Sequence, residues 1–369
     1  MNTVGLTTTT ADRKRRAGQR MVVGLAGARI SEEERAFIRE ARPGGFVLFA
    51  RNIESPEQVR ELNRELFCLL PNDLPPVRCV DQEGGLVQRV KAPATVWPPM
   101  RFVGNVGDVR FTEQVGAALA REIRACGFDL DFAPVCDVDS NPKNPVIGQR
   151  AFAGRSHDVS KHVSACIKGM QDEGLIACAK HFPGHGDTSV DSHLELPIVE
   201  KETPDLEQCE LPPFAAAISA GVGSVMTAHV VYPTWDEDYP ATMSRRIIYG
   251  QLRERLRYGG VVFSDDMEMK AVRGRYPLEL QLRLATEATV DSFLFCKELP
   301  LAVEGYETLI RQQEDHKGQE SLAINAEKRW NAMRERFFIG APPVPGLEVL
   351  GNSEHQLLAA RARIEGAQS

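Results

Sequence analysis

The stretch "LIACAKHF" (residues 175–182) joins five apolar or small residues to a lysine, a histidine and a phenylalanine. A short, continuous apolar run of this kind is typical of a β-strand buried on both faces, as in a parallel sheet. Packing alone does not explain a polar pair, Lys180 and His181, at the end of such a strand. We therefore interpret residues 175–182 as a buried strand that ends at a functional site.

Similar apolar runs recur along the chain, and amphipathic helical patterns separate them. One such helical segment, residues 55–70, opens with a Ser55-Pro56 start signal and carries apolar residues at helical spacing. The seven other runs are "MVVGLAG" (21–27), "GGFVLFA" (44–50), "PVRCVDQ" (76–82), "GFDLDFAPV" (127–135), "GSVMTAHV" (223–230), "GGVVFSDD" (259–266) and "DSFLFC" (291–296).

Eight strands that alternate with helices predict an α/β protein built from parallel β-α units. Eight is the number that closes a (β/α)8 TIM-type barrel, a fold that uses about 200–400 residues as a single domain. A doubly wound open sheet is the alternative, but no G-x-G-x-x-G follows the first strand and no phosphate loop is found. We therefore predict a single-domain (β/α)8 barrel.

The chain divides into three segments. Residues 1–20 form a basic tail that we expect to be disordered, and residues 21–340 form the barrel. Residues 341–369 form a Pro-rich turn followed by a C-terminal helix or tail. The apolar stretch that follows the basic run is short and closes at Arg29, so it fits a first buried strand better than a secretory signal.

Composition narrows the class of protein. The 369 residues are 43% hydrophobic and 26% charged, with a net charge of −7, which is ordinary for a globular protein. The acidic balance indicates neither a nucleic-acid binder nor a membrane-surface protein. No stretch approaches the roughly 18 apolar residues of a membrane span. We expect a small-molecule partner, no cofactor, and a monomer or weak oligomer.

The eight cysteines are scattered along the chain, and none forms a C-x-x-C pair. Several of them lie within apolar runs. Scattered, buried thiols fit a reducing compartment better than a disulfide framework. We therefore expect a cytoplasmic protein.

Polar side chains follow the ends of most predicted strands, where a barrel places its catalytic groups. Some of these residues are also good helix caps, which could account for one of the two aspartates at the end of the 259–266 run. Capping explains the Lys-His pair poorly. The residues concerned are Asp81, Glu83, Asp131, Asp137, Lys180, His181, His229, Asp265 and Asp266.

The loop "KHFPGHGDTSVDSHLELP" (180–197) holds three histidines and two aspartates within a short span. Glycosidases need an acid to protonate the leaving oxygen and a carboxylate that acts as nucleophile or base. Asp265, at a strand end, is a candidate nucleophile. His193 is a candidate acid because histidine titrates near neutral pH, and Asp191 could orient its ring.

Two other classes of protein remain open on these residues. The same histidines could be ligands in a metal-dependent barrel hydrolase, although their spacing matches no compact motif such as H-E-x-x-H. A sugar-binding protein without turnover is the other alternative. The competent residues at the nucleophile and acid positions, Asp265 and His193, disfavour that reading.

Several motifs also carry a family resemblance. The 180–197 loop resembles the signature of the β-N-acetylglucosaminidases of glycoside hydrolase family 3, in the single-domain NagZ type. Further blocks resemble that family in the same order and extend the resemblance over roughly residues 20–340. These blocks are "PGGFVLFARNI" (43–53), "VDQEGGLVQRV" (80–90), "NPVIGQRAF" (144–152), "SVMTAHVVYP" (224–233) and "GVVFSDDMEMKAV" (260–272).

The resemblance implies roles for the catalytic residues. Asp265, the first aspartate of S-D-D, would be the nucleophile that forms a covalent glycosyl-enzyme. His193 would be the acid/base, with Asp191 as its partner. No metal is implied.

The resemblance also implies sugar-binding residues, namely Asp81, Arg89, Arg150, Lys180, His181 and Met226. One departure from the family pattern is Leu86, which stands where many relatives have arginine. Arg89 is retained, so we expect little loss of binding, although one salt bridge could be absent.

The implied activity is exo-acting removal of non-reducing terminal N-acetylglucosamine with retention of configuration. The single-domain form is similar to enzymes that act on 1,6-anhydro-muropeptides in peptidoglycan recycling in the cytoplasm. A histidine acid also leaves phosphorolysis open, and other sugar specificities occur in the family.

Overall fold

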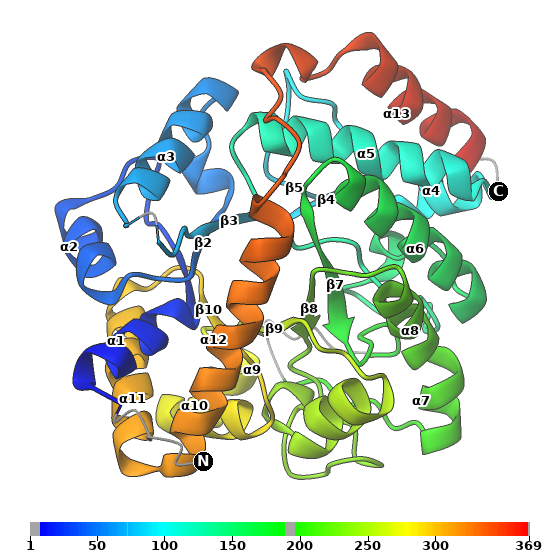
Figure 1. The fold of residues 1–369 in the computed structure, drawn as a ribbon. Helices are drawn as coiled ribbons and strands as arrows, with labels where there is room; N and C mark the ends of the chain where they lie inside the picture. The colour runs from blue at the N-terminus through cyan, green and yellow to red at the C-terminus, as the bar shows by residue number, and fades with distance from the viewer. Residues whose placement is uncertain (1–7, 72, 189–195, 368–369) are drawn as a thin grey trace, which may run out of the picture.

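The computed structural model describes residues 8–71, 73–188 and 196–367. Its centre is a closed barrel of eight parallel strands, in the order β1-β10-β9-β8-β7-β6-β3-β2 (Figure 1). The strands are β1 (Met21–Gly24), β2 (Gly45–Leu48), β3 (Val77–Val80), β6 (Leu130–Asp131), β7 (Ile176–Phe182), β8 (Ser224–Thr227), β9 (Val261–Asp266) and β10 (Ser292–Phe295). Each lies within one of the eight predicted runs, which confirms the (β/α)8 barrel.

Helices surround the barrel because each carries an apolar face that must be covered. In chain order they are α2 (Glu32–Ala41), α3 (Pro56–Cys68), α4 (Met100–Asn105), α5 (Val109–Ala125), α6 (Ser156–Asp172), α7 (Thr203–Cys209), α8 (Leu211–Ser219), the π-helical η4 (Arg246–Arg255), α9 (Lys270–Arg273), α10 (Leu278–Glu287) and α11 (Leu299–Asp315). Short 3-10 turns are η1 (Ala50–Asn52), η2 (Gly148–Arg150), η3 (Ala241–Met243) and η5 (Leu347–Val349). No helix of the described ranges is both long enough and apolar enough to cross a membrane.

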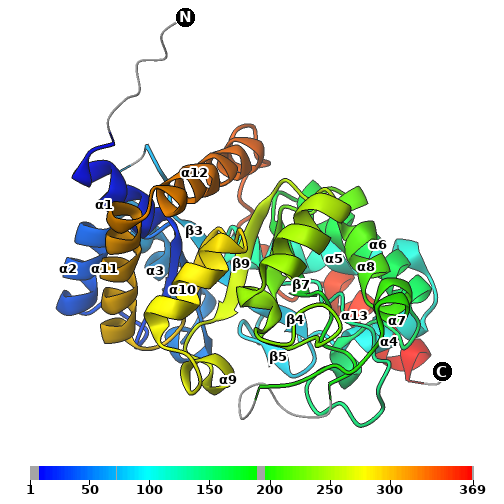
Figure 2. The same cartoon turned by 90° about the horizontal axis from the view of Figure 1, so that it is seen from below.

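The two ends of the barrel differ. Helix α12 (Lys317–Phe338) crosses the amino-terminal end, while the hairpin of β4 (Gln82–Gly84) and β5 (Val87–Gln88) lies at the opposite end (Figure 2). The ring of Trp330 meets Phe263 of β9 edge-on at 5.6 Å between centroids. Helix α12 therefore plugs one end of the barrel, and the other end remains available for a site.

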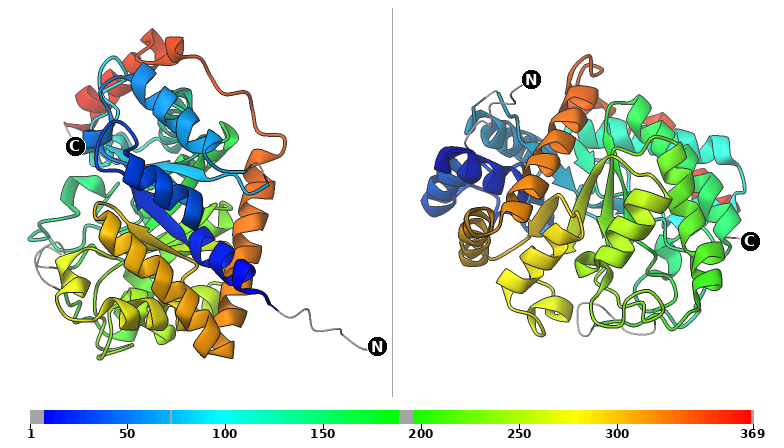
Figure 3. Two further views of the ribbon diagram at one scale, coloured as in Figure 1. Left: turned by 90° about the vertical axis from the view of Figure 1, so that its left-hand side faces the viewer. Right: turned by 60° about the horizontal axis from the view of Figure 1, so that its bottom comes forward.

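The N-terminal segment differs from the sequence prediction. Residues 1–20 were expected to be disordered, but Thr10–Gln19 forms helix α1 beside α11 and α12 (Figure 3). The side chain of Thr9 caps this helix through a capping box. Arg16, part of the basic run, lies 3.3 Å from Glu327 of α12. The charges that suggested a solvated tail are thus paired with acidic residues far along the chain.

The C-terminal segment also packs on the barrel. After α12 the chain runs along the outside of the molecule to α13 (Ser353–Gly366), which packs on α4 and α5 (Figure 3). The buried carboxylate of Glu122 accepts a hydrogen bond from the backbone N–H of Gly351 at 2.8 Å and lies 2.9 Å from His355 Nδ1. These contacts hold α13 against α5.

Candidate active site

A pocket of about 210 Å³ lies at the carboxyl ends of the barrel strands. All seven described residues for which the family resemblance implies a catalytic or sugar-binding role line it, together with apolar side chains around its walls. The seven are Asp81, Arg89, Arg150, Lys180, His181, Met226 and Asp265; the other lining residues include Phe49, Glu83, Val87, Phe132, Val146, His185, Asp266 and Met269. The pocket is smaller than the roughly 300–1,000 Å³ of sites for drug-sized molecules.

The position of these side chains follows from the strand ends. Asp81 comes directly after β3, Lys180 and His181 lie at the end of β7, and Asp265 lies at the end of β9. Parallel strands of a barrel bring their carboxyl ends to one rim, so residues far apart in sequence meet there.

One carboxylate links the cations of the site. Glu83 accepts hydrogen bonds from Arg150 Nε and Nη2 at 2.8 Å each, and it forms an ion pair with Lys180, whose Nζ lies 2.6 Å from Glu83 Oε1. Burial would raise the pKa of Glu83, but the charges of Arg150 and Lys180 hold it well below its usual range. Burial alone would lower the pKa of Lys180, but the negative charges of Asp81 and Glu83 raise it above its usual value. All three groups are therefore ionised at neutral pH.

Asp81 joins two cations at the rim. Its Oδ1 lies 2.9 Å from Lys180 Nζ, and its Oδ2 lies 3.3 Å from Arg89 Nη2. The guanidinium of Arg89 also lies over the Phe49 ring, 5.5 Å from its centroid. Leu86, at the turn of the β4–β5 hairpin, is 96% exposed. Arg89, not the residue at position 86, forms the ion pair with Asp81.

A second carboxylate orients the histidines. Asp137 Oδ2 lies 2.7 Å from His181 Nδ1, and Asp137 Oδ1 accepts a hydrogen bond from the backbone N–H of His185 at 2.7 Å. His185 Nδ1 lies 2.9 Å from Thr188 Oγ1. Burial lowers the pKa of His185 to about 4, so this ring is neutral near pH 7. Asp137 thus fixes the orientation of the His181 ring through its Nδ1 atom.

The pKa values of two adjacent aspartates at the end of β9 are shifted in opposite directions. Burial would raise the pKa of Asp265, but interactions with His229 and His181, a hydrogen bond from the Asp266 backbone N–H at 2.8 Å and the charge of Lys180 lower it overall. Burial raises the pKa of Asp266 to about 7. Asp265 is therefore the ionised carboxylate of this pair, which is the state that a nucleophile requires.

Asp131, at the end of β6, is fully buried beside this site. Burial raises its pKa to about 8, although the backbone N–H of Gln82 donates to its Oδ1 at 2.8 Å. Its Oδ2 has no hydrogen-bond partner among the described residues. The neutral acid is therefore the favoured form of Asp131 at neutral pH.

The remaining predicted residues have different outcomes. Asp191 and His193 lie outside the described residues. His229 is buried, and its two ring nitrogens lie 2.9 Å from Thr242 Oγ1 and 3.1 Å from the Asp266 carbonyl oxygen.

Within the part of the chain that the structure describes, no three His, Cys, Asp or Glu side chains are grouped to hold a metal ion. All eight cysteines are free thiols.

The sequence prediction missed the roles of two residues that organise the pocket. Glu83 and Asp137 were among the polar residues that follow predicted strands, but the sequence assigned neither a partner nor a role. Their partners lie 67 residues away, for Arg150, and 44 residues away, for His181. No local pattern in the sequence encodes such pairs.

Comparison with known proteins agrees with this geometry. Residues 13–328 match the N-terminal domain of glycosyl hydrolase family 3. A β-hexosaminidase from Nitrosomonas eutropha is 37% identical over 284 residues, which span 75% of this chain and 80% of that protein.

Solved structures are similar over most of the chain. A family 3 β-N-acetylglucosaminidase from Paenibacillus sp. superposes with a TM-score of 0.91 at 35% identity, covering 96% of this chain and 68% of that one. Native NagZ from Neisseria gonorrhoeae gives a TM-score of 0.77 at 31% identity, covering 94% and 97%. That NagZ has also been solved in complex with N-trifluoroacetyl-D-glucosamine.

The matched region contains every barrel strand and every described residue that the motifs singled out. The family resemblance that those motifs carry is therefore confirmed, and the chain belongs to glycosyl hydrolase family 3.

Proposed function

We propose that this protein is an exo-acting, retaining β-N-acetylglucosaminidase. The observation that carries the proposal is the ionised carboxylate of Asp265 in a pocket of about 210 Å³ with Lys180, Arg150 and Asp81 around it. A pocket of this size suits one sugar residue, which fits removal of a single terminal unit. The relatives named β-hexosaminidase and β-N-acetylglucosaminidase support the choice of sugar.

In the proposed mechanism the Asp265 carboxylate attacks the anomeric carbon and forms a covalent bond to it. The bond from that carbon to the leaving oxygen breaks, and His193, oriented by Asp191, gives the leaving oxygen its proton. Water then attacks the glycosyl-enzyme while neutral His193 accepts a proton, so the sugar is released with its configuration retained.

The proposed binding roles follow from the chemistry of each side chain. Asp81 accepts hydrogen bonds from sugar hydroxyls, and Lys180 and Arg150 donate to hydroxyl or acetamido oxygens. Arg89 holds Asp81 in place. His181 presents its Nε2 edge, and Met226 supplies an apolar wall at the end of β8.

For the natural substrate we propose 1,6-anhydro-muropeptides of peptidoglycan recycling in the cytoplasm. The similarity to NagZ over nearly its whole length supports this choice. The free thiols fit a reducing compartment.

The test is hydrolysis of 4-nitrophenyl N-acetyl-β-D-glucosaminide in EDTA by wild type, Asp265→Asn, His193→Ala and the control Asp205→Asn, an exposed acid on α7. We expect Asp265→Asn to lower kcat by at least about a thousandfold and the control to be unchanged. His193→Ala should impair the aryl substrate less than GlcNAc-anhydro-MurNAc, because an activated leaving group needs little acid help. Proton NMR of the first product should show the β anomer.

The alternatives give different results in the same assay. Activity that EDTA abolishes and zinc restores would indicate a metal-dependent hydrolase. GlcNAc 1-phosphate formed in phosphate buffer would indicate a phosphorylase. Equal activity of Asp265→Asn and wild type would refute the carboxylate mechanism.

A further inference from the structure

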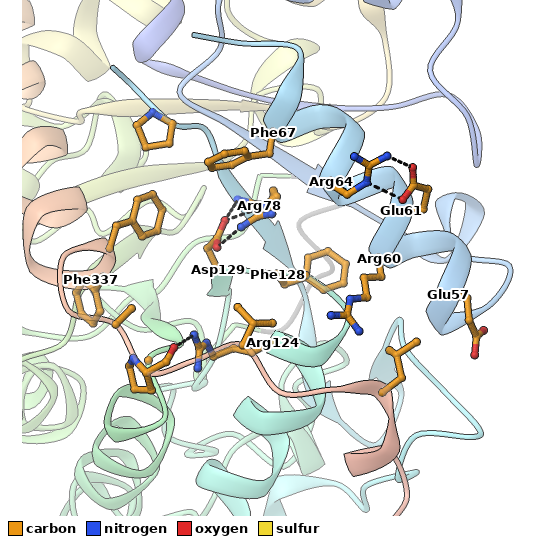
Figure 4. A pocket seen from close by; sticks show the side chains of 18 residues that line it. Glu57, Arg60, Glu61, Arg64, Phe67, Arg78, Arg124, Phe128, Asp129 and Phe337 are labelled. Carbon is orange, nitrogen blue, oxygen red and sulfur yellow. Dashed lines mark hydrogen bonds and ion pairs between the residues drawn. The ribbon is translucent and has the colours of Figure 1, made fainter. Parts of the chain in front are cut away.

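A second, larger cavity lies at the amino-terminal end of the barrel. It measures about 690 Å³ and lies between α3 and the C-terminal end of α5, with the 338–347 segment over it (Figure 4). Its floor is made by residues at or just before the starts of β3 and β6, the strands whose carboxyl ends lead to Asp81 and Asp131. None of its lining residues lines the candidate active site. The cavity is therefore a separate site.

The walls of this amino-end cavity are mainly aromatic and aliphatic. Four phenylalanines line it, and the segment above contributes proline, valine and leucine side chains. These residues are Phe67, Phe128, Phe337, Phe338, Pro342, Val344 and Leu347. A volume within the usual range for small-molecule sites, together with several rings, suits a flat apolar body.

Most of the charged groups in the cavity are already paired. Arg78 is held bidentately by Asp129 at 2.6 and 2.7 Å, and its guanidinium lies over the Phe67 ring, 5.1 Å from the centroid. Arg64 pairs bidentately with Glu61 on the same helix. These ion pairs are satisfied and need no ligand.

Arg124 is also satisfied, but by neutral groups. It donates to the backbone carbonyls of Glu173 and Pro342 at 2.7 Å each, and so ties the covering segment to the end of α5. Its positive charge faces no carboxylate within ion-pair distance among the described residues.

Arg60 is the cation that remains. Among the described residues it makes no hydrogen bond or ion pair through its side chain, and Figure 4 shows the guanidinium directed from α3 towards the cavity. Four arginines line the cavity against three carboxylates, Glu57, Glu61 and Asp129, so the lining carries one excess positive charge. A ligand with a single negative charge would complement it.

We propose that the amino-end cavity binds a small aromatic carboxylate. The flat ring of the ligand packs among the phenylalanines below the 338–347 segment. Its carboxylate accepts hydrogen bonds from Arg60 at the mouth. The site is independent of the proposed glycosidase chemistry because it shares no residue with that pocket.

The test is calorimetric titration of the full chain with 2-naphthoate, and with 2-naphthamide as the uncharged match. We expect one saturable site for naphthoate, and binding about tenfold weaker or more for naphthamide. Arg60→Gln, which removes the charge but keeps a polar side chain, should weaken naphthoate by a similar factor. Val344→Asp, an exposed position in the covering segment, should also weaken it by adding a carboxylate beside the ligand.

The matched control is Arg110→Gln, an exposed arginine in the first turn of α5, at the opposite end of that helix from Arg124. It should leave naphthoate affinity unchanged, and all three variants should keep wild-type hydrolysis of the aryl substrate. Absence of saturable binding, equal binding of naphthamide, or equal loss in Arg110→Gln would overturn the proposal. Competitive inhibition of hydrolysis by naphthoate would place the ligand in the other pocket and would also overturn it.

Discussion

Substitution of Glu83 by glutamine tests how the pocket holds its cations. Glu83 is 3% exposed and is the shared acceptor of two hydrogen bonds from Arg150 and one from Lys180. Glutamine has nearly the same shape but no charge, and its amide group turns a donor towards one of the cations. Glu83→Gln therefore leaves two buried cations with too few acceptors.

The expected loss of stability is large. Removing one partner of a buried ion pair costs about 3–5 kcal/mol, because the remaining charge stays buried. The pKa of Glu83 lies below its usual range, so its contribution to stability is present above about pH 4.3 and is lost as the pH falls towards the folded-state pKa. The difference between wild type and variant should therefore shrink in acid.

The effect on activity has a separate cause. Lys180 and Arg150 lose the common partner that fixes their positions, and a displacement of about 1 Å can cost a hundredfold in rate. We expect kcat/KM for the aryl substrate to fall by about that factor. Because Lys180 and Arg150 are the proposed donors to the sugar, their displacement should also weaken the binding of N-acetylglucosamine.

The assay combines urea unfolding at pH 7 and at about pH 3, below the unfolded-state pKa, with steady-state kinetics and calorimetric binding of N-acetylglucosamine at pH 7. Glu237→Gln, an exposed glutamate, is the matched control and should change none of these quantities. A Glu83→Gln protein with wild-type stability and kcat/KM within twofold of wild type would refute the reasoning. Loss of stability without weaker sugar binding would show that the network supports the fold alone.

Three further substitutions test other parts of the structure. Asp137→Asn removes the carboxylate that fixes His181, and we expect kcat/KM to fall about 10–100-fold with little change in the melting temperature. Asp131→Asn tests the raised pKa of about 8. In wild type, Asp131 ionises at a lower pH in the unfolded chain than in the folded chain. The free energy of unfolding therefore declines as the pH rises from about 4 to about 8. The variant should show a smaller decline across that window, as measured by denaturation at several pH values. Trp330→Ala empties the plug beneath Phe263 and should cost about 3–5 kcal/mol in unfolding free energy.

Each of these three predictions has a contrary outcome. Unchanged kinetics of Asp137→Asn would mean that His181 needs no carboxylate to be oriented. An unchanged pH profile of stability in Asp131→Asn would mean that another group causes the decline. A loss below about 1 kcal/mol in Trp330→Ala would mean that the barrel end closes over the cavity.

The local pattern of apolar residues in the sequence was sufficient to predict the barrel. Each of the eight apolar runs contains one barrel strand, because a parallel strand covered on both faces must be apolar along its whole length. The polar residues that end these runs, such as Lys180 and Asp265, therefore stand out from the sequence. The barrel rule that carboxyl ends meet at one rim then predicts that they share a pocket.

The pairing of charges was decided only by the tertiary structure. Glu83 meets Lys180 and Arg150, and Asp137 meets His181, across 44 to 97 residues of chain, so nothing in a local pattern could assign them. The same reason explains why the basic run near the N-terminus was predicted to be a disordered tail. Its three arginines pair with Glu320 and Glu327 of α12, which become their neighbours only when the barrel closes. The sequence by itself thus determined where the apolar runs lie, how they alternate with helical segments, and which polar side chains end the runs. Only the folded chain decided which charges become partners, because those energies depend on distance and burial and not on separation in sequence.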